Sequence, residues 1–280
     1  MCMWGATTWL KIDDSGAWYA DRTPSGTATV RLRLNGTTLT ANAWGEGAED
    51  LLARVPGLCG LHDGGVEAIE PHHPIVRELQ KRMRGYRIGR VGLTYQRLLA
   101  AGIAQKVTGA NAKPALRQIA WKWGEQAPGP REDLWLLPDA KALKRRAYYE
   151  FHPFGVEQHR AMLLKRIAER AHALQRAAAM DPVAGREHLQ KLRGIGPWTS
   201  GVVMGGPLGD PDAVPMGDYH LPNIVAWHLA REPRAYDARM MELLEPYTGR
   251  RGQVARMLKA GAGGAPKYGP KSEARDFRQD

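Results

Sequence analysis

A short glycine-containing segment, Leu-Arg-Gly-Ile-Gly-Pro-Trp-Thr at residues 192–199, constrains the fold more than any other part of the chain. The glycines on either side of Ile195 allow a sharp turn between a helix ending near Lys191 and a new helix beginning around Pro197. They also keep side chains away from the first backbone N–H groups of the new helix, which, together with the helix dipole, favour phosphate. The segment therefore predicts a tight helix–helix turn that binds phosphate. A turn without any ligand is the alternative.

The overall charge and the cysteine content limit the classes of protein to consider. The 280 residues include 40 Lys and Arg against 29 Asp and Glu, a formal net charge of +11, which indicates a polyanionic partner. Cys2 and Cys59 are too few for a disulfide framework, a four-cysteine zinc site or a cysteine-ligated iron–sulfur cluster. No segment has the roughly 18 consecutive apolar residues of a membrane span, and residues 1–11 lack the features of a secretion signal. We expect a cytoplasmic protein with no membrane partner and no metal site.

Residues 1–72 have the pattern of a small antiparallel sheet domain. Apolar and polar residues alternate over residues 27–34, and Asn35-Gly36 then predicts a tight turn into a strand over residues 37–43. Further elements are expected nearby: strands over residues 4–12 and 17–20, and a short helix over residues 49–54 that Pro56-Gly57 stops.

From residue 73 to residue 260 the apolar residues follow the helical period. Five helices are expected in this region. The first starts at Pro74, the second runs over residues 95–103, and the third ends at Gly124. The fourth runs over residues 156–176, and the fifth starts at Asp181-Pro182. Residues 261–280 are rich in Gly, Pro and Lys and are expected to form a flexible tail. The fold class expected is mostly α with an N-terminal antiparallel β-sheet domain (α+β).

A second element lies downstream of the glycine turn. Asp218 follows Thr199 by 19 residues, which is the length of one helix and a loop rich in Gly and Pro. With this spacing, the sequence resembles the helix-hairpin-helix/Gly-Pro-Asp superfamily of DNA base-excision glycosylases. Within that superfamily it resembles the 3-methyladenine DNA glycosylase II branch, over about residues 27–258. The resemblance implies the helix-hairpin-helix glycosylase fold, and double-stranded DNA containing damaged bases as the partner of a nucleoid-associated enzyme.

The resemblance implies that Asp218 is the catalytic aspartate. Members of the superfamily flip a damaged nucleotide out of the duplex and cut its N-glycosidic bond. An ionised carboxylate near the sugar stabilises the developing oxocarbenium ion and helps to orient or deprotonate water. The alternative is that Asp218 only caps the next helix, because Leu221, Ile224, Val225 and His228 lie at helical spacing. The upstream hairpin favours catalysis.

Trp198 and Tyr219 are the residues that the resemblance places in the base pocket. Alkylated purines are often cationic, and an electron-rich aromatic face attracts cations. Packing in the core is the alternative for both rings. The chain departs from the family at Val202, where relatives have a second pocket tyrosine. Because this change thins the aromatic cage, an oxidised, deaminated or bulky base is the alternative to an alkylated purine.

Two groups of residues are expected to contact DNA on the strength of the same resemblance. Gln105 and Lys106 lie where relatives insert side chains into the gap left by the flipped base, with phosphate contact or solvation as the alternative for Lys106. The hairpin residues expected to bind the DNA backbone are Arg193, Gly194, Ile195, Gly196 and Thr199.

Trp198 also indicates which type of reaction to expect. Lyase-active members of the superfamily carry a nucleophilic lysine at this position, and an indole cannot form a Schiff base. We therefore expect a monofunctional DNA glycosylase, acting as a monomer and without a cofactor, apart from a monovalent cation of the kind that relatives' hairpins often hold. A non-catalytic helix-hairpin-helix module that binds DNA is the alternative from a different class, and the position of Asp218 argues against it.

Overall fold

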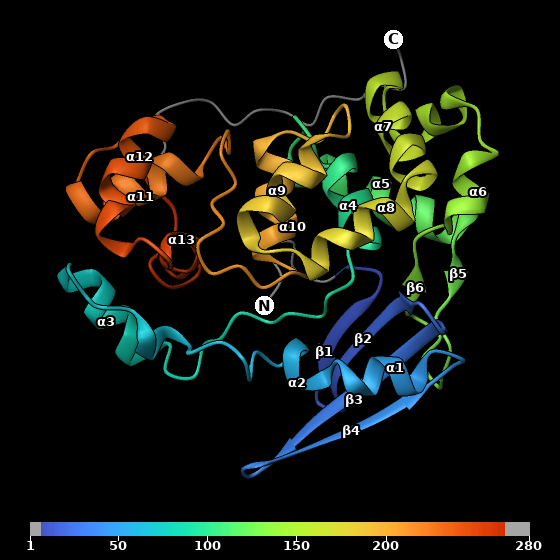
Figure 1. Cartoon of the computed structure of the whole chain (residues 1–280), viewed down its shortest axis with the longest axis horizontal. Coiled ribbons are helices and arrows are strands. Elements are labelled where there is room, and N and C mark those ends of the chain that lie inside the picture. The colour runs from blue at the N-terminus through green and yellow to red at the C-terminus, as the bar shows by residue number, and fades with distance from the viewer. Residues whose placement is uncertain (1–6, 267–280) are drawn as a thin grey trace.

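The computed structural model describes residues 7–266 (Figure 1). Its N-terminal part is an antiparallel sheet whose four strands lie in sequence order, as the alternating pattern predicted. The strands are β1 (Leu10–Asp13), β2 (Gly16–Thr23), β3 (Gly26–Asn35) and β4 (Thr38–Trp44).

The hairpin between β3 and β4 turns one residue later than predicted. Asn35 pairs with Thr38, so the two turn residues are Gly36 and Thr37. Gly36 has a φ of +60°, a conformation that glycine adopts without steric cost. The glycine therefore fixes the position of the turn.

The rest of the described chain is mostly helical, which confirms the predicted fold class. Its α-helices are α1 (Ala48–Ala53), α2 (Val55–Leu58), α3 (Pro74–Arg82), α4 (Tyr95–Ile103), α5 (Gly109–Trp123), α6 (Ala140–Lys144), α7 (Gln158–Glu169), α8 (Ala171–Gln175), α9 (Pro182–Gln190), α10 (Pro197–Gly205), α11 (Leu221–Ala230), α12 (Asp237–Leu244) and α13 (Arg251–Gly261). Short 3₁₀ helices lie at η1 (Val66–Ala68), η2 (Tyr148–Phe154), η3 (Arg176–Ala179) and η4 (Glu245–Tyr247), and two short strands, β5 (Glu125–Gln126) and β6 (Trp135–Leu136), pair with each other.

Two expectations about helix ends are wrong. Residues 156–176 do not form one helix, because Arg170 leaves the helical conformation with a φ of −110° between α7 and α8. Pro56 and Gly57 do not stop a helix but lie inside α2. Proline is tolerated there because it stands in the first turn, where its missing N–H has no partner within the helix.

The hydrophobic core consists of two clusters. The larger one joins the sheet to the helices from α4 to α10, so the sheet packs directly against helices. The smaller one joins α3 to α11, α12 and α13, which lie together on the left of Figure 1. Each cluster therefore contains residues from both sides of the expected boundary between residues 72 and 73. Residues 267–280 of the expected tail lie outside the described residues.

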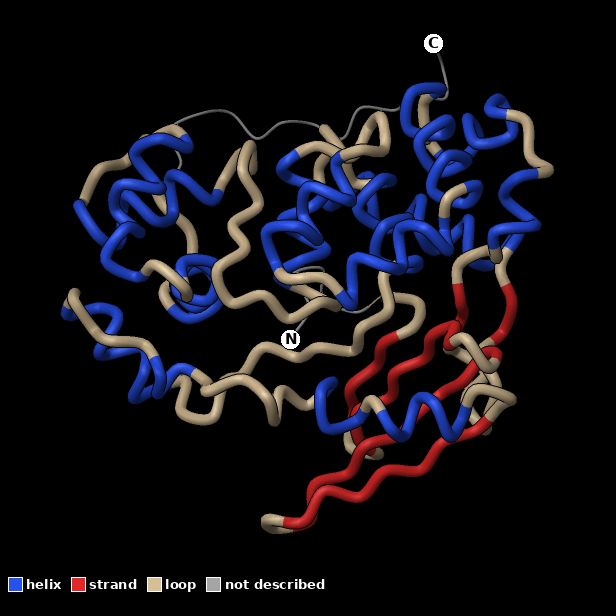
Figure 2. The backbone as a smooth tube through the Cα atoms, in the orientation of Figure 1, coloured by secondary structure: helices blue, strands red, loops and turns tan. Residues whose placement is uncertain are grey.

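The two clusters set the position of the loop that carries Asp218. Helix α10 belongs to the larger cluster and α11 to the smaller one, so residues 206–220 cross from one to the other (Figure 2). Within residues 7–266, no helix is long and apolar enough to cross a lipid bilayer.

Candidate active site

The predicted turn joins α9 to α10. Helix α9 ends at Gln190, and α10 begins at Pro197 with Gly196 at its N-cap, as the sequence predicted. Gly194 has a φ of +104°, and a Cβ at this position would lie 2.9 Å from Cδ1 of Leu163. A side chain is therefore excluded at Gly194 both by the backbone conformation and by a neighbouring helix.

Gly196 is a glycine for a different reason. Its φ is −97°, which any residue adopts, and a Cβ there would meet no atom within 4 Å. The fold itself does not require a glycine at this position. The missing side chain instead leaves open the N-terminus of α10, whose first-turn N–H groups have no partner within the helix. This opening is the feature that a phosphate needs.

The remaining hairpin residues divide into buried and exposed ones. Ile195 is 3% exposed and Thr199 is 1% exposed, so their side chains anchor the turn in the core. Arg193 is exposed. Contact with DNA through the hairpin would therefore use backbone groups and the Arg193 side chain.

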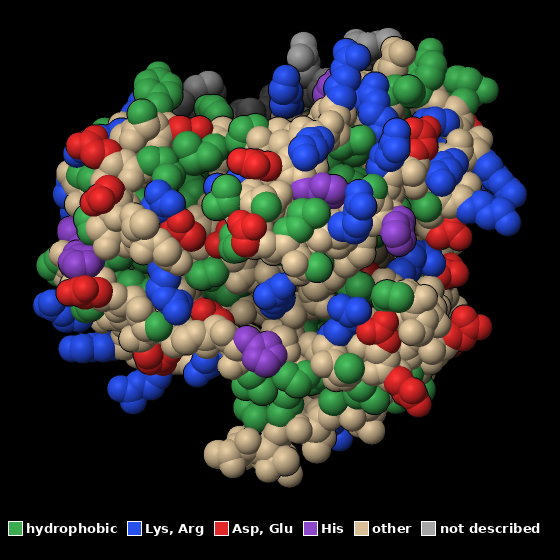
Figure 3. Space-filling view, in the orientation of Figure 1, with side chains coloured by type: hydrophobic (Ala, Val, Ile, Leu, Met, Phe, Trp, Pro, Cys, Tyr) green, Lys and Arg blue, Asp and Glu red, His purple; other side chains and the backbone are tan. Residues whose placement is uncertain are grey.

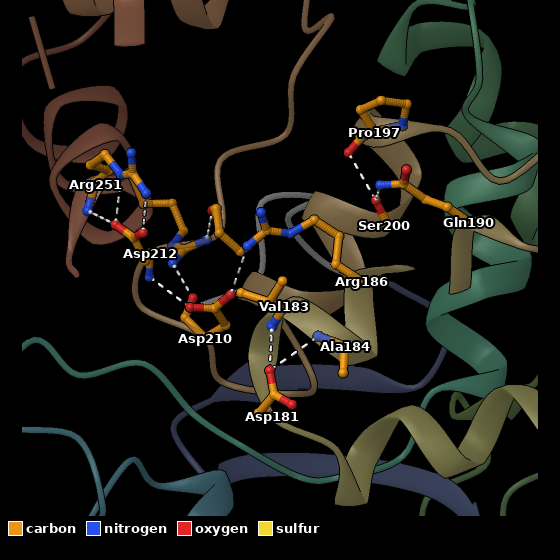
Figure 4. A network of polar contacts seen from close by, with 12 residues as sticks. Asp181, Val183, Ala184, Arg186, Gln190, Pro197, Ser200, Asp210, Asp212 and Arg251 are labelled. Carbon is orange, nitrogen blue, oxygen red and sulfur yellow. Dashed lines mark hydrogen bonds and ion pairs between the residues drawn. The ribbon is translucent and has the colours of Figure 1, made fainter. Parts of the chain in front are cut away.

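Polar contacts hold the hairpin rigid. Nε2 of Gln190 in α9 donates to Oγ of Ser200 in α10 at 2.8 Å, and this hydroxyl donates to the carbonyl oxygen of Pro197 at 3.2 Å (Figure 4). Nε2 of Gln105 donates to the carbonyl oxygen of Gly194 and to Oγ1 of Thr199, both at 2.8 Å. The structure thus places Gln105 against the hairpin, where it acts as a support.

Lys106 is placed differently from its neighbour. Its side chain is exposed, and its backbone has a φ of +55°, which is uncommon for a residue other than glycine. The two residues expected to enter DNA together therefore separate in the structure: Gln105 faces the hairpin, and Lys106 is accessible to a partner.

Asp218 uses its two oxygens for different contacts. Oδ1 accepts from the backbone N–H groups of His220, the N-cap residue of α11, at 3.0 Å and of Leu221 at 2.9 Å, so it caps the start of this helix from two residues upstream. Oδ2 accepts from the indole Nε1–H of Trp198 at 3.1 Å. Asp218 therefore both caps the helix and lies beside the hairpin, although the sequence presented these two roles as alternatives.

The surroundings of Asp218 keep its carboxyl group ionised. Burial of this half-buried group raises its pKa, but the charge of Lys259, the indole N–H of Trp198 and the two backbone N–H groups together bring the pKa below its usual value. The site therefore offers a negative charge, which a developing cation requires. Lys259 lies in α13, and no sequence spacing pointed to it.

Trp198 and Tyr219 are also placed differently from each other. Trp198 is half-buried, and its ring edge is held against Asp218. Tyr219 is 84% exposed and packs edge-on against the ring of His220, with 4.9 Å between ring centroids. The structure thus brings Trp198 to Asp218 and leaves the Tyr219 ring at the surface.

Two other carboxylates near the hairpin have structural roles. Asp210 is 4% exposed and pairs with Arg186 at 3.4 Å, and Asp212 pairs with Arg251 (Figure 4). Arginines therefore neutralise both of these carboxylates. Asp218, in the same loop, instead has the indole of Trp198 as a partner.

A cavity of about 420 Å³ lies beside this site, within the usual size range of small-molecule pockets. Its wall includes Gly201 and Val202 of α10, one turn after Trp198, and Pro215, three residues before Asp218. The sheet contributes another part of the wall. Among the described residues, no group of three or more His, Cys, Asp and Glu side chains could hold a metal ion.

No protein-family model matches the sequence, and no curated protein matches it closely enough to indicate a relationship. A 3-methyladenine DNA glycosylase from Archaeoglobus fulgidus has a similar structure, with a TM-score of 0.74, 17% identity, and coverage of 90% of this chain and 89% of that one.

Two structures solved with DNA are also similar. The 8-oxoguanine glycosylase/lyase of Clostridium acetobutylicum, bound to double-stranded DNA with cytosine opposite 8-oxoguanine, has a TM-score of 0.66 at 14% identity and covers 90% of this chain and 98% of its own. The 3-methyladenine DNA glycosylase of Schizosaccharomyces pombe, bound to abasic DNA, has a TM-score of 0.60 at 18% identity and covers 72% of this chain and 98% of its own. The chain therefore has the fold of the helix-hairpin-helix DNA glycosylases.

Proposed function

We propose that this protein is a monofunctional DNA glycosylase of base-excision repair, which hydrolyses the N-glycosidic bond of a damaged purine. The observation that carries the proposal is Asp218, an ionised carboxylate held beside the hairpin by the indole of Trp198. A cavity of nucleobase-compatible size lies beside it. The similar structures are those of DNA glycosylases, which supports the same reaction class.

In the proposed reaction, each part of the site has one role. The open N-terminus of α10 binds a backbone phosphate, and the flipped base enters the cavity. The bond between C1′ and the base nitrogen breaks, and its electron pair leaves with the base. Asp218 stabilises the resulting oxocarbenium ion, water then adds its oxygen to C1′, and the water proton passes to the base or to solvent.

An alkylated purine is the first candidate substrate, because a cationic base gains from the aromatic face of Trp198. An oxidised, deaminated or bulky base is the second candidate, and Val202 in the cavity wall favours it, since an aliphatic side chain stands where relatives have a second pocket tyrosine. The similar structures include both 3-methyladenine and 8-oxoguanine enzymes.

A panel of duplexes, each with one defined lesion, tests this proposal. Excision is read by alkaline cleavage at the abasic product. We expect cleavage at one or more damaged purines and none in undamaged DNA. Binding to the whole panel without any base loss would instead identify a non-catalytic helix-hairpin-helix module.

The product is expected to be an abasic site in an intact strand. Trp198 occupies the position at which lyases carry the Schiff-base lysine, so the enzyme lacks that nucleophile. Borohydride trapping during turnover should therefore yield no covalent complex. A complex formed in stoichiometric yield, with the adduct mapped to a lysine, would show that the enzyme is bifunctional.

DNA binding is expected to depend strongly on salt. Basic side chains gather over α6 and α7 and beside α3 on one face of the molecule (Figure 3), and the net charge is +11. Because backbone contacts release counterions, the log–log slope of affinity against salt should be about −0.9 per phosphate neutralised. Titrations of undamaged duplex at several salt concentrations measure this slope, and a flat profile would exclude backbone binding.

The proposal extends to three further properties of the protein. We infer that it acts as a monomer on DNA in the cytoplasm, associated with the nucleoid. A monovalent cation at the hairpin is compatible with the geometry there. The carbonyl oxygens of Leu192 and Gly194 each accept one hydrogen bond, and a carbonyl oxygen has a second lone pair.

A further inference from the structure

One arginine in the wall of the cavity has no role in the mechanism above. Nη1 of Arg256 in α13 donates to the carbonyl oxygen of Ala213 at 3.4 Å, and Nη2 donates to that of Asp210 at 3.3 Å. Its Nε has no hydrogen-bond partner among residues 7–266, and within that range no carboxylate lies within 4.0 Å of it. The charges of Asp210 and Asp63 act on the guanidinium, but neither carboxylate forms an ion pair with it.

The backbone leaves room for this arginine. A Cβ at Gly205 would lie 2.1 Å from Nη1 of Arg256, so any larger residue at that position would displace the guanidinium. Arg256 also lies one helical turn before Lys259, whose charge lowers the pKa of Asp218. The guanidinium is thus close to the site at which the proposed reaction takes place.

The other charges of the cavity do not offset Arg256. Arg87 and Arg97 add two more guanidinium groups to the described wall, against a single carboxyl group, that of Asp21. Asp21 is 3% exposed and already accepts from the Tyr19 hydroxyl and from Nε2 of Gln96. Burial raises its pKa, which favours the neutral form. The described wall therefore carries a net positive charge.

Charge inside such a cavity acts more strongly than in water, because the low dielectric reduces screening. A cationic base would lose hydration and meet like charge, whereas a neutral base with a carbonyl oxygen would accept from a guanidinium. We propose that Arg256 is a specificity-determining residue that makes this cavity select neutral, carbonyl-bearing damaged purines over cationic alkylated ones. This inference rests on the proposed glycosylase function and, within it, favours the second candidate substrate over the cationic alkylated purine.

The test compares two bases of the same shape that differ in charge. 7-Methylguanine is cationic in DNA, and 7-methyl-7-deazaguanine is its neutral counterpart; a 2′-fluoro sugar prevents excision of either. We expect the wild-type protein to bind the neutral duplex about tenfold more tightly, a difference of about 1.4 kcal/mol. Arg256→Met should bring the ratio close to one.

Two further variants accompany this comparison. Arg239→Met removes the same charge from a surface ion pair with Glu232 and Glu242, and it should retain the tenfold preference. Gly205→Ala displaces the guanidinium without deleting it and should lower the preference as Arg256→Met does. Gly205→Ala therefore still tests the role of Arg256 if the Arg256→Met protein does not fold.

Failure of the inference can be told apart from failure of the proposed function. Equal or tighter wild-type binding of the cationic duplex would overturn the role of Arg256, as would an unchanged preference in both folded cavity variants. Excision of bases in the lesion panel would then still support the glycosylase. If no lesion of the panel is released, the function itself is wrong and this inference falls with it.

Discussion

Asp218→Asn is expected to reduce single-turnover base excision by about 10²-fold or more, because the negative charge that stabilises the cationic transition state is removed. The fold should survive. Asparagine caps a helix as well as aspartate does, so the contacts from the N–H groups of His220 and Leu221 to Oδ1 can remain. Affinity for the lesion duplex should be retained or should rise, since a negative charge near DNA is lost. Excision rate and gel-shift affinity are measured on the same duplex.

A matched control separates the charge of Asp218 from general effects of charge in this region. Asp237 accepts from the backbone N–H of Gly217 at 2.7 Å, so it lies beside the same loop, and it is not among the residues that line the cavity. Asp237→Asn should leave excision within about the twofold range that surface substitutions usually cause. Near-wild-type excision by Asp218→Asn would mean that Asp218 is only a helix cap.

The two hairpin glycines are expected to respond differently to the same substitution. Gly194→Ala should destabilise the fold by about 1–2 kcal/mol or more, since alanine is strained at a φ of +104° and its Cβ would contact Leu163. Gly196→Ala should leave stability nearly unchanged, because its Cβ would meet no atom within 4 Å. It should nevertheless weaken DNA binding about tenfold, the equivalent of one or two hydrogen bonds to phosphate at about 1 kcal/mol each.

Thermal melting and DNA titration of the two variants test this contrast. A loss of about 1–2 kcal/mol corresponds to several degrees in Tm for a chain of this size. Gly194→Ala should therefore show a lower Tm, whereas Gly196→Ala should show a normal Tm with reduced affinity. If Gly196→Ala binds DNA as wild type does, phosphate does not bind at the N-terminus of α10.

Much of the fold followed from local sequence signals. Asp181 accepts from the N–H groups of Val183 and Ala184, as expected for a residue that caps α9 (Figure 4), and Pro197 begins α10. These signals are local because capping and turning involve neighbours in the chain. The sequence does not indicate the break at Arg170, since apolar residues continue at helical spacing on both sides of it.

The candidate site could be predicted only in part, because some of its residues come from distant parts of the chain. The spacing of Thr199 and Asp218 brought the hairpin and the carboxylate together, and the hydrogen bond from Trp198 joins them in the structure. Lys259 and Arg256 could not be found in this way, because they reach the site from α13 through packing of the smaller cluster. The support that Gln105 gives to the hairpin is likewise a contact between distant parts of the chain.

The central claim is that Asp218 enables hydrolysis of a base from DNA, and direct detection of both products tests it most closely. A duplex with the best lesion of the panel is incubated with excess enzyme, and the mixture is analysed by mass spectrometry without alkali. We predict the free damaged base together with a full-length strand that has lost the base and gained the elements of water, and neither product with Asp218→Asn over the same time. A bound duplex of unchanged mass with the wild-type protein, or equal product yields from the two proteins, would contradict the account.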